Sequence, residues 1–273
     1  MPLPCARDGV AETTQEDVRE VPNPITDSSH MRYAILSDVH GNLEALEVVL
    51  ADILARSPEG IVCLGDFVGY GPDPNECVET LRPHLVGAVA GNHDLAALGE
   101  VDIATFNSFA QAAILWTRDQ LTVPVRAYLE GLPRQIVPNG FVAVHGSVRD
   151  PVEEYILDPA TAAANFQAAD FHLCVVGHSH VPAVFVAEEG RVSGVPLPPD
   201  RPLHLDEGRR YIVNVGSVGQ PRDGDPRAAY LWYDGAAQVA SLIRLEYPLE
   251  VTQTKMMKAG LPSMLAERLA VGR

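Results

Sequence analysis

The sequence predicts an α/β fold in which the first strands run parallel. From residue 32 onward, short apolar runs alternate with segments of helical periodicity, in the order strand, helix, strand, helix, strand. A helix that joins two strands of one sheet makes a right-handed crossover, so those strands are expected to be parallel. Beyond residue 131 the apolar residues recur at about every second position, which predicts that antiparallel strands complete the sheets.

The parallel strands come first along the chain. A strand is expected at 32–37, where an apolar run ends in polar residues. A helix over 43–56 follows, because its apolar residues recur at helical spacing and Asn42 precedes them as a cap. Further strands are expected at 61–64 and 85–90, separated by a Gly/Pro-rich loop and a short helix.

The next region mixes helices with strands. Residues 107–131 are expected to be helical. A hairpin follows around an Asn139-Gly140 turn, and a helical segment near 159–169 leads into a strand at 172–177. Strand-like pieces then lie at 183–187, 211–215, 228–233 and 238–244. The proline-rich stretch 195–202 is expected to be a loop.

A polar arm, one folded domain and a helical extension are expected along the chain. Residues 1–30 contain six acids and two bases, which predicts a polar N-terminal arm. The folded unit spans 31–245, a length that suits one large domain. Residues 246–273 are amphipathic and broken at Gly260-Leu261-Pro262, which predicts two short helices packed on the domain.

The chain is strongly acidic and therefore unsuited to polyanionic partners. It has 20 Lys and Arg against 36 Asp and Glu, for a net charge of −16. Long nucleic acids and anionic membranes bind positive surfaces, so we expect neither as a partner. The four cysteines are widely spaced, and no apolar run approaches the roughly 18 residues of a membrane span, which favours a cytoplasmic protein. The composition leaves a homo-oligomer open.

Polar side chains follow the predicted strands. They are, in chain order, Asp38 and His40, Asp66, Asn92 and His93, His145, and His178 and His180. Ligand sites of open α/β sheets form beyond the carboxyl ends of strands, so these side chains are expected to meet. One such residue alone is more often a turn, a helix cap or a core histidine, but five such groups in one chain predict a metal site. Oxygen and imidazole ligands without thiolate suit Mn²⁺, Fe, Zn²⁺, Co²⁺ or Ni²⁺.

The ordered motifs Asp-x-His, Gly-Asp, Gly-Asn-His-Asp, His and Gly-His-x-His resemble those of the calcineurin-like metallophosphoesterase superfamily over residues 31–245. Three stretches are also similar to its compact prokaryotic phosphodiesterase and phosphatase branch: GDFVGYGPDPNECVETLR, NVGSVGQPRDGDPRAAY and the C-terminal AGLPSMLAERLA. The resemblance implies an α/β fold built as a four-layer α/β/β/α sandwich with mixed sheets. It also implies a hydrolase with a dinuclear metal site at the carboxyl ends of the strands.

The resemblance assigns roles to the polar residues. It implies that Asp38, His40 and His180 hold one metal, that Asn92, His145 and His178 hold the other, and that Asp66 bridges both. The ions would be two divalent or trivalent transition metals, Mn²⁺ first among them, and a bridging hydroxide would attack a phosphodiester, or a phosphomonoester, of a small or nucleotide-like substrate. His93 would be a catalytic residue that binds phosphate or protonates the departing alkoxide. Asn92, His93 and Arg222 are the expected substrate-binding residues, and the loops 67–76, 147–158 and 216–226 are expected to decide substrate choice.

One departure from the family pattern bears on function. Sequences that resemble the Ser/Thr protein phosphatases carry the motif Gly-Asp-x-Val-Asp-Arg-Gly after the second strand. In this chain Gly69 and Tyr70 stand where that motif has its Asp-Arg pair. The Asp normally orients the catalytic histidine and the Arg normally grips phosphate, so the partner of His93 is left unassigned. Asp94 is open to two interpretations, as a helix cap or as an orienting residue.

Two alternatives to a phosphodiesterase stay open. One is a phosphomonoesterase, including a Ser/Thr protein phosphatase, which the missing Asp-Arg pair disfavours. The other is a non-catalytic scaffold of the same fold. Members of that kind have lost metal ligands, whereas every expected ligand position is filled in this chain.

Overall fold

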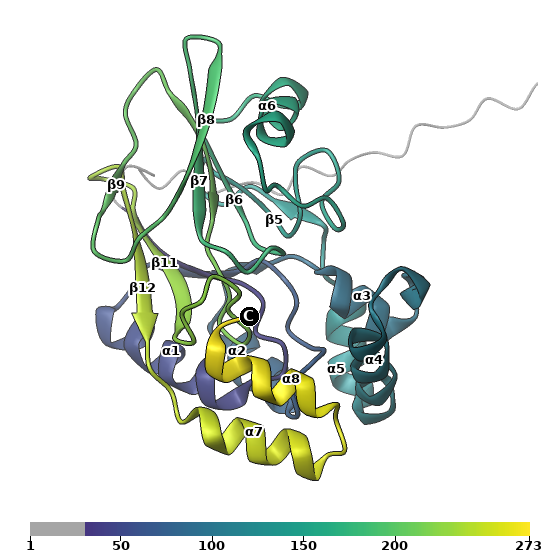
Figure 1. Cartoon of the computed structure of the whole chain (residues 1–273). Helices are drawn as coiled ribbons and strands as arrows, with labels where there is room; N and C mark the ends of the chain where they lie inside the picture. Colours follow the sequence, from purple (N-terminus) through teal and green to yellow (C-terminus); the bar gives the residue numbers. More distant parts are fainter. Residues whose placement is uncertain (1–30) are drawn as a thin grey trace, which may run out of the picture.

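The computed structural model describes residues 31–273, so the predicted polar arm over 1–30 lies outside the described residues. Two six-stranded mixed sheets form the centre of the molecule (Figure 1). The first has the order β3 (Gly87–Ala88), β2 (Gly60–Cys63), β1 (Arg32–Leu36), β11 (Ala228–Asp234), β12 (Val239–Leu245) and β9 (Leu203–His204). The second has the order β4 (Gln135–Ile136), β5 (Val142–Val144), β6 (Leu173–Val176), β10 (Arg210–Asn214), β7 (Ala183–Glu188) and β8 (Arg191–Pro196).

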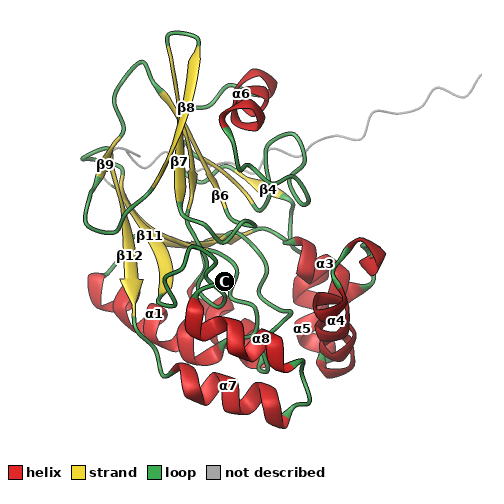
Figure 2. Ribbon diagram, viewed as in Figure 1, coloured by secondary structure: helices red, strands yellow, loops and turns green. Residues whose placement is uncertain are grey.

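The two sheets pack face to face with helices on their outer sides (Figure 2). Alternate residues such as Ile35 of β1 and Val175 of β6 form a core between the sheets. The outer face of the first sheet is covered by α1 (Leu43–Arg56), α2 (Pro74–Leu81) and α5 (Val123–Glu130), and that of the second by α6 (Pro159–Ala168). The predicted four-layer α/β/β/α sandwich is therefore confirmed.

Strand directions agree with the sequence in the first sheet and differ in the second. β1 pairs parallel with β2, and β2 with β3, as the crossover helices predict. The segment 211–215 was expected to be antiparallel, but β10 pairs parallel with β6 and antiparallel only with β7. The reason is that the chain leaves the second sheet after β8, contributes β9 to the first, and returns between β6 and β7.

Several boundaries also differ from the expectation. The strand expected at 85–90 is reduced to the two residues of β3. β8 extends into the start of the stretch 195–202, which was expected to be a loop. This edge strand is largely exposed, so its sequence lacks the apolar pattern that would have predicted a strand. The helical region 107–131 divides into α4 (Ser108–Gln120) and α5. The Asn139-Gly140 hairpin turn is confirmed, with φ of 41° and 85°.

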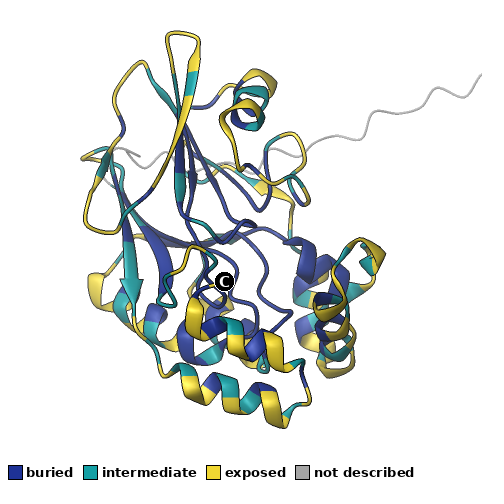
Figure 3. Ribbon diagram, viewed as in Figure 1, coloured by how far each residue is buried: buried dark blue, intermediate teal, exposed yellow. Residues whose placement is uncertain are grey.

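The C-terminal residues form the two expected helices, α7 (Leu249–Lys258) and α8 (Ser263–Glu267), followed by a 3₁₀ turn (Arg268–Val271). α7 lies against α1 (Figure 1), where Lys255 Nζ is 2.5 Å from Glu44 Oε1 and 2.8 Å from Asp73 Oδ2. Figure 3 shows that the central strands and the loops beyond their ends are buried, while the edge strand β8 is largely exposed and the helices expose their outer faces. Among residues 31–273 there is no helix of the length and apolar character that a bilayer crossing requires.

Candidate active site

The loops at the carboxyl ends of the strands bring the predicted residues together. Asp38 and His40 follow β1, Asp66 follows β2, Asn92 and His93 open α3 (Asn92–Leu98), His145 follows β5, and His178 and His180 follow β6. All eight side chains are buried. Backbone hydrogen bonds join the loops within each sheet, from His40 N to Asp66 O (2.9 Å) in the first and from Gly177 N to His145 O (2.9 Å) in the second. Asp38 Oδ2 also accepts from His178 N (3.2 Å), which links β1 to β6.

The backbone is strained at these strand ends. Asp38, His40, Asp66, His178 and His180 have φ between 50° and 65°. Residues other than glycine rarely adopt this left-handed conformation, and where they do the cost is on the order of 1–3 kcal/mol each, typically at functional sites. Gly91 is required for a different reason, because a Cβ there would lie 2.0 Å from Asp66 Oδ1.

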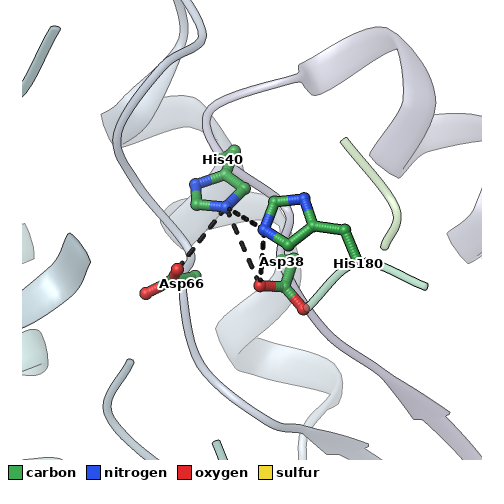
Figure 4. A group of neighbouring side chains, drawn as sticks. All are labelled: Asp38, His40, Asp66 and His180. Carbon is green, nitrogen blue, oxygen red and sulfur yellow. Dashed lines mark hydrogen bonds and ion pairs between the residues drawn. The ribbon is translucent and has the colours of Figure 1, made fainter. Parts of the chain in front are cut away.

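One half of the site is a cluster of Asp38, His40, Asp66 and His180 (Figure 4). Each offers one ligand atom, and these atoms all lie within 4.8 Å of one another. His180 Nε2 is 3.1 Å from Asp38 Oδ1, and His40 Nε2 is 3.2 Å from His180 Nε2 and 3.4 Å from Asp66 Oδ2. In Figure 4 the two imidazole nitrogens point toward the two carboxylates.

The other half of the site surrounds His145. Its Nε2 lies 3.1 Å from His178 Nδ1, 3.3 Å from Asn92 Oδ1 and 3.5 Å from Asp66 Oδ2. The same carboxylate oxygen of Asp66 therefore faces both halves. We call these seven residues the metal-ligand cluster: Asp38, His40, Asp66, Asn92, His145, His178 and His180.

Backbone carbonyls fix which nitrogen of each imidazole faces inward. The Nδ1 atoms of His40, His145 and His180 lie 3.0, 2.8 and 2.6 Å from the carbonyl oxygens of Val68, Leu64 and Gln220. A carbonyl only accepts hydrogen bonds, so each Nδ1 carries the proton and each Nε2 presents its lone pair to the cluster. His178 is reversed, because its Nε2 donates to Glu153 O (3.1 Å) and its Nδ1 faces inward. Such outer hydrogen bonds are typical of metal-ligating histidines.

Burial shifts the pKa values of the cluster histidines and of Asp66 toward their neutral forms. Burial lowers the pKa of His40, His145 and His180, and lowers that of His178 to about 2, so all four imidazoles are neutral. Burial, with the carboxylates of Asp94 and Asp38, raises the pKa of Asp66 well above its ordinary value.

Unpartnered oxygens show where the cations fit. Asp38 Oδ1 and Asp66 Oδ2 are buried and have no hydrogen-bond partner among residues 31–273. A buried carboxylate oxygen is costly unless it is paired or coordinates a metal. Neutral imidazole lone pairs, an amide oxygen and these carboxylates together form a donor set that suits two transition-metal ions.

Asp94 caps α3 as one interpretation of the sequence expected, but it orients the loop of Asp66 and not the side chain of His93. Its carboxylate accepts hydrogen bonds from the backbone nitrogens of Gly91 (3.0 Å), Asp66 (2.8 Å) and Val68 (3.2 Å). The bond to Gly91 caps the first turn of α3, and the other two fix the loop that presents Asp66. Asp94 is therefore a positioning residue for Asp66, which both halves of the site share.

His93 lies at the boundary between the cluster and a pocket of about 240 Å³. Its Nδ1 is buried and has no hydrogen-bond partner in the described part of the chain. The ring instead packs on Tyr70, Phe106 and His40, at centroid distances of 4.4, 5.1 and 4.8 Å. A Cβ on Gly69 would lie 2.6 Å from His93 Nδ1. In the motif of the protein phosphatases this position carries the orienting Asp. In this chain the position faces His93 Nδ1 but has no side chain. Aromatic packing thus takes the place of the partner that the sequence left unassigned.

Arg222 lines the same pocket, over the ring of Tyr70 at 5.7 Å. Its Nε and one terminal nitrogen donate to Gln220 Oε1 at 3.2 and 2.8 Å, and its backbone nitrogen donates to His180 O. Within residues 31–273 it forms no ion pair with a carboxylate, so a neutral amide orients the guanidinium. Arg222 lies in a different loop from the arginine of the protein phosphatase motif, which is absent after Asp66 in this chain.

The remaining pocket residues carry no motif, and sequence reasoning did not single out most of them. We call Tyr70, Phe106, Glu153, Tyr155 and Arg222 the pocket wall. All but Phe106 come from the three loops that were expected to decide substrate choice. Tyr155 stacks on the imidazole of His178 at 3.7 Å and 22°. Nothing in the local sequence distinguishes Phe106, Glu153 or Tyr155, because each reaches the pocket only through the path of its loop.

The comparisons with known proteins agree with this geometry. Residues 31–235 match the model of the calcineurin-like phosphoesterase superfamily domain. An uncharacterised protein of Methanocaldococcus jannaschii is 40% identical over 245 residues, covering 88% of this chain and 98% of the relative. The crystal structure of a metallophosphoesterase from Sphaerobacter thermophilus is 44% identical with a TM-score of 0.80, covering 89% of this chain and 100% of that one. A hypothetical protein of Pyrococcus horikoshii shares the fold with a TM-score of 0.71 at 20% identity, over 89% and 98% of the two chains. The chain therefore belongs to the calcineurin-like phosphoesterase superfamily of metal-binding hydrolases.

Proposed function

We propose that this protein is a dinuclear metal-dependent phosphodiesterase, with some activity on phosphomonoesters, that acts on small or nucleotide-like substrates. The observation that carries the proposal is the position of Asp66 Oδ2. It lies 3.4 Å from His40 Nε2 and 3.5 Å from His145 Nε2, buried and without a hydrogen-bond partner among residues 31–273. A carboxylate oxygen shared in this way suits a bridge between two cations.

Each half of the metal-ligand cluster would hold one ion, preferably Mn²⁺. Asp38, His40 and His180 would hold the first, Asn92, His145 and His178 the second, and Asp66 both. When bound, such a pair of ions activates water as the nucleophile and stabilises the charge that develops on the phosphoryl oxygens. The residues of the chain supply the orientation, because the backbone carbonyls behind the histidines fix every imidazole before any ion arrives.

The substrate would be bound by residues at the boundary between cluster and pocket. Arg222 offers an oriented guanidinium to the phosphoryl oxygens. Asn92 and His93 line the pocket beside it. We assign to His93 the hydrogen bond to the leaving oxygen and the transfer of its proton, a contribution of about 10²–10⁴ in rate.

The charges of the pocket favour a diester over a monoester. Arg222 is the basic residue among those described that line it, and the acidic residue Glu153 lines it as well. A phosphomonoester dianion brings one more negative charge to this pocket than a diester does, and meets no second arginine there. The absence of the phosphatase Asp-Arg pair after Asp66 supports the same order.

A paired assay tests the proposal. The purified chain should retain about two transition-metal ions in elemental analysis, and with Mn²⁺ it should hydrolyse bis-p-nitrophenyl phosphate with kcat/KM at least about tenfold above p-nitrophenyl phosphate. A tenfold preference for the monoester would identify a phosphomonoesterase instead. A chain that binds no metal would be a scaffold of the same fold.

A further inference from the structure

The pocket beside the metal-ligand cluster has a flat, aromatic lining. The rings of Tyr70, Phe106 and Tyr155 all line its volume of about 240 Å³. Tyr155 is held against His178 by its stacked ring, and Phe106 meets His93 edge to face at 5.1 Å. Walls of this kind suit a planar or cyclic substituent on the phosphoester.

Two side chains with a formal charge line the pocket, and they have opposite signs. Arg222 is oriented by the amide of Gln220, and the proposed function commits it to the phosphoryl group that is hydrolysed. Glu153 is the other, and its carboxylate forms no hydrogen bond or ion pair within residues 31–273. The neighbouring Glu154 differs, because its carboxylate accepts from Ser147 Oγ at 2.6 Å and from Asn165 Nδ2 at 2.8 Å.

The backbone of Glu153 is fixed although its carboxylate is free. Its carbonyl oxygen accepts from His178 Nε2 (3.1 Å), and its nitrogen donates to Asp150 Oδ1 (3.1 Å). These contacts hold the backbone of Glu153 beside the pocket and do not involve its carboxylate, so a substitution of the carboxylate leaves them in place. This arrangement suits a recognition group better than a structural one.

We propose, building on the function proposed above, that Glu153 determines specificity. Its carboxylate accepts a hydrogen bond from a hydroxyl or amino group on a ring-bearing substituent, and it repels a substituent that carries a second phosphate. The preferred substrate is then an ester with a single phosphoryl group attached to an uncharged, hydroxylated or aminated ring. Nucleosides belong to this chemical class, whereas bisphosphates and polyphosphates do not.

The repulsion has a measurable size. Two like charges near a protein surface, separated by several ångströms and partly screened by salt, change an affinity by about tenfold. Within residues 31–273 no second cationic side chain lines the pocket to offset this effect.

Binding of two matched nucleotides tests the inference independently of turnover. The Mn²⁺-loaded protein is titrated in a calorimeter with thymidine 5′-phosphate and with thymidine 3′,5′-bisphosphate, which differ by one phosphate. We expect the monophosphate to bind about tenfold more tightly, and Glu153→Gln to reduce that ratio to about threefold or less. Glu207→Gln is the control, because it removes the same charge from the turn before β10, at the end of that strand remote from the site.

The outcomes separate the inference from the function on which it rests. Equal affinities for the two nucleotides in the unmodified protein, or a ratio that Glu153→Gln leaves unchanged, would overturn the role of Glu153. The p-nitrophenyl esters of the same two nucleotides are then assayed for hydrolysis. If neither is hydrolysed while the affinity ratio behaves as expected, the specificity inference stands and the proposed phosphodiesterase activity fails.

Discussion

The metal-ligand cluster and the pocket wall are neighbours built in different ways. Every residue of the cluster is buried, and each side chain comes from the end of a strand or the first turn of a helix. The wall comes from loops, and Tyr155 in it is 44% exposed. Cluster side chains are held by backbone carbonyls and amides, whereas the rings of the wall pack on the histidines. The sheets therefore position the cluster, while the wall depends on the path of the loops.

The largest effect should follow from breaking the cluster at its shared ligand. Asp66→Asn removes the charge that faces His40 and His145, so we expect loss of at least one metal ion and a fall in kcat/KM to background. Elemental analysis and the bis-p-nitrophenyl phosphate assay measure both effects. Asp200→Asn, in an exposed turn, is the control. Full metal content with unchanged turnover would show that Asp66 is not a ligand.

The same difference in construction explains what could be predicted from the sequence. A buried run such as β1 followed by Asp38 and His40 can be recognised locally, because the strand places its next residues at the edge of the sheet. All seven cluster residues were predicted in this way, and the structure brings their side chains together. Their strained backbone and the tautomer of each histidine could not be predicted, since both depend on contacts with distant carbonyls such as Gln220 O.

The wall and the second sheet depend on the path of the chain in space. Tyr155 stacks on His178 because hydrogen bonds from Ser147 and Asn165 to Glu154 hold its loop in place. No local sequence pattern predicts these hydrogen bonds. The parallel pairing of β10 was predicted wrongly for the same reason, because it follows from the excursion of the chain through β9. Of the wall residues, Arg222 was expected from the sequence, whereas Phe106, Glu153 and Tyr155 were not.

The next effect should separate catalysis from metal binding. His93 lines the pocket and is held by ring packing rather than by a carboxylate. We expect His93→Ala to lower kcat by about 10²–10⁴ while both ions are retained, because the variant loses a proton donor and no ligand. His204→Ala, on an exposed strand residue, should leave kcat unchanged. A loss of metal equal to that of Asp66→Asn would place His93 in the cluster instead.

A smaller effect on activity is expected from Asp94, which positions the loop of Asp66 without lining the pocket. In Asp94→Asn, the amide group would set a donor against one of the backbone nitrogens of Gly91, Asp66 and Val68. We expect the affinity for metal to fall by about 10–100-fold, with kcat recovered at saturating Mn²⁺. Competition with a chelator measures the affinity. If excess metal does not restore turnover, Asp94 acts in the reaction and not through the loop of Asp66.

The smallest effect should come from the wall, and it decides whether the two regions are separable. Tyr155→Leu removes a ring that stacks on His178 and lines the pocket, yet His178 keeps its hydrogen bond to Glu153 O. Because an aromatic contact contributes about 0.5–1.5 kcal/mol, KM for a ring-bearing diester should rise by about two- to tenfold with kcat and metal content unchanged. Tyr155→Phe keeps the ring and should match the unmodified protein. If Tyr155→Leu instead loses metal, the stacked ring is part of what holds His178. Tyr155 would then support the cluster as well as line the pocket, and the two regions would not be separable.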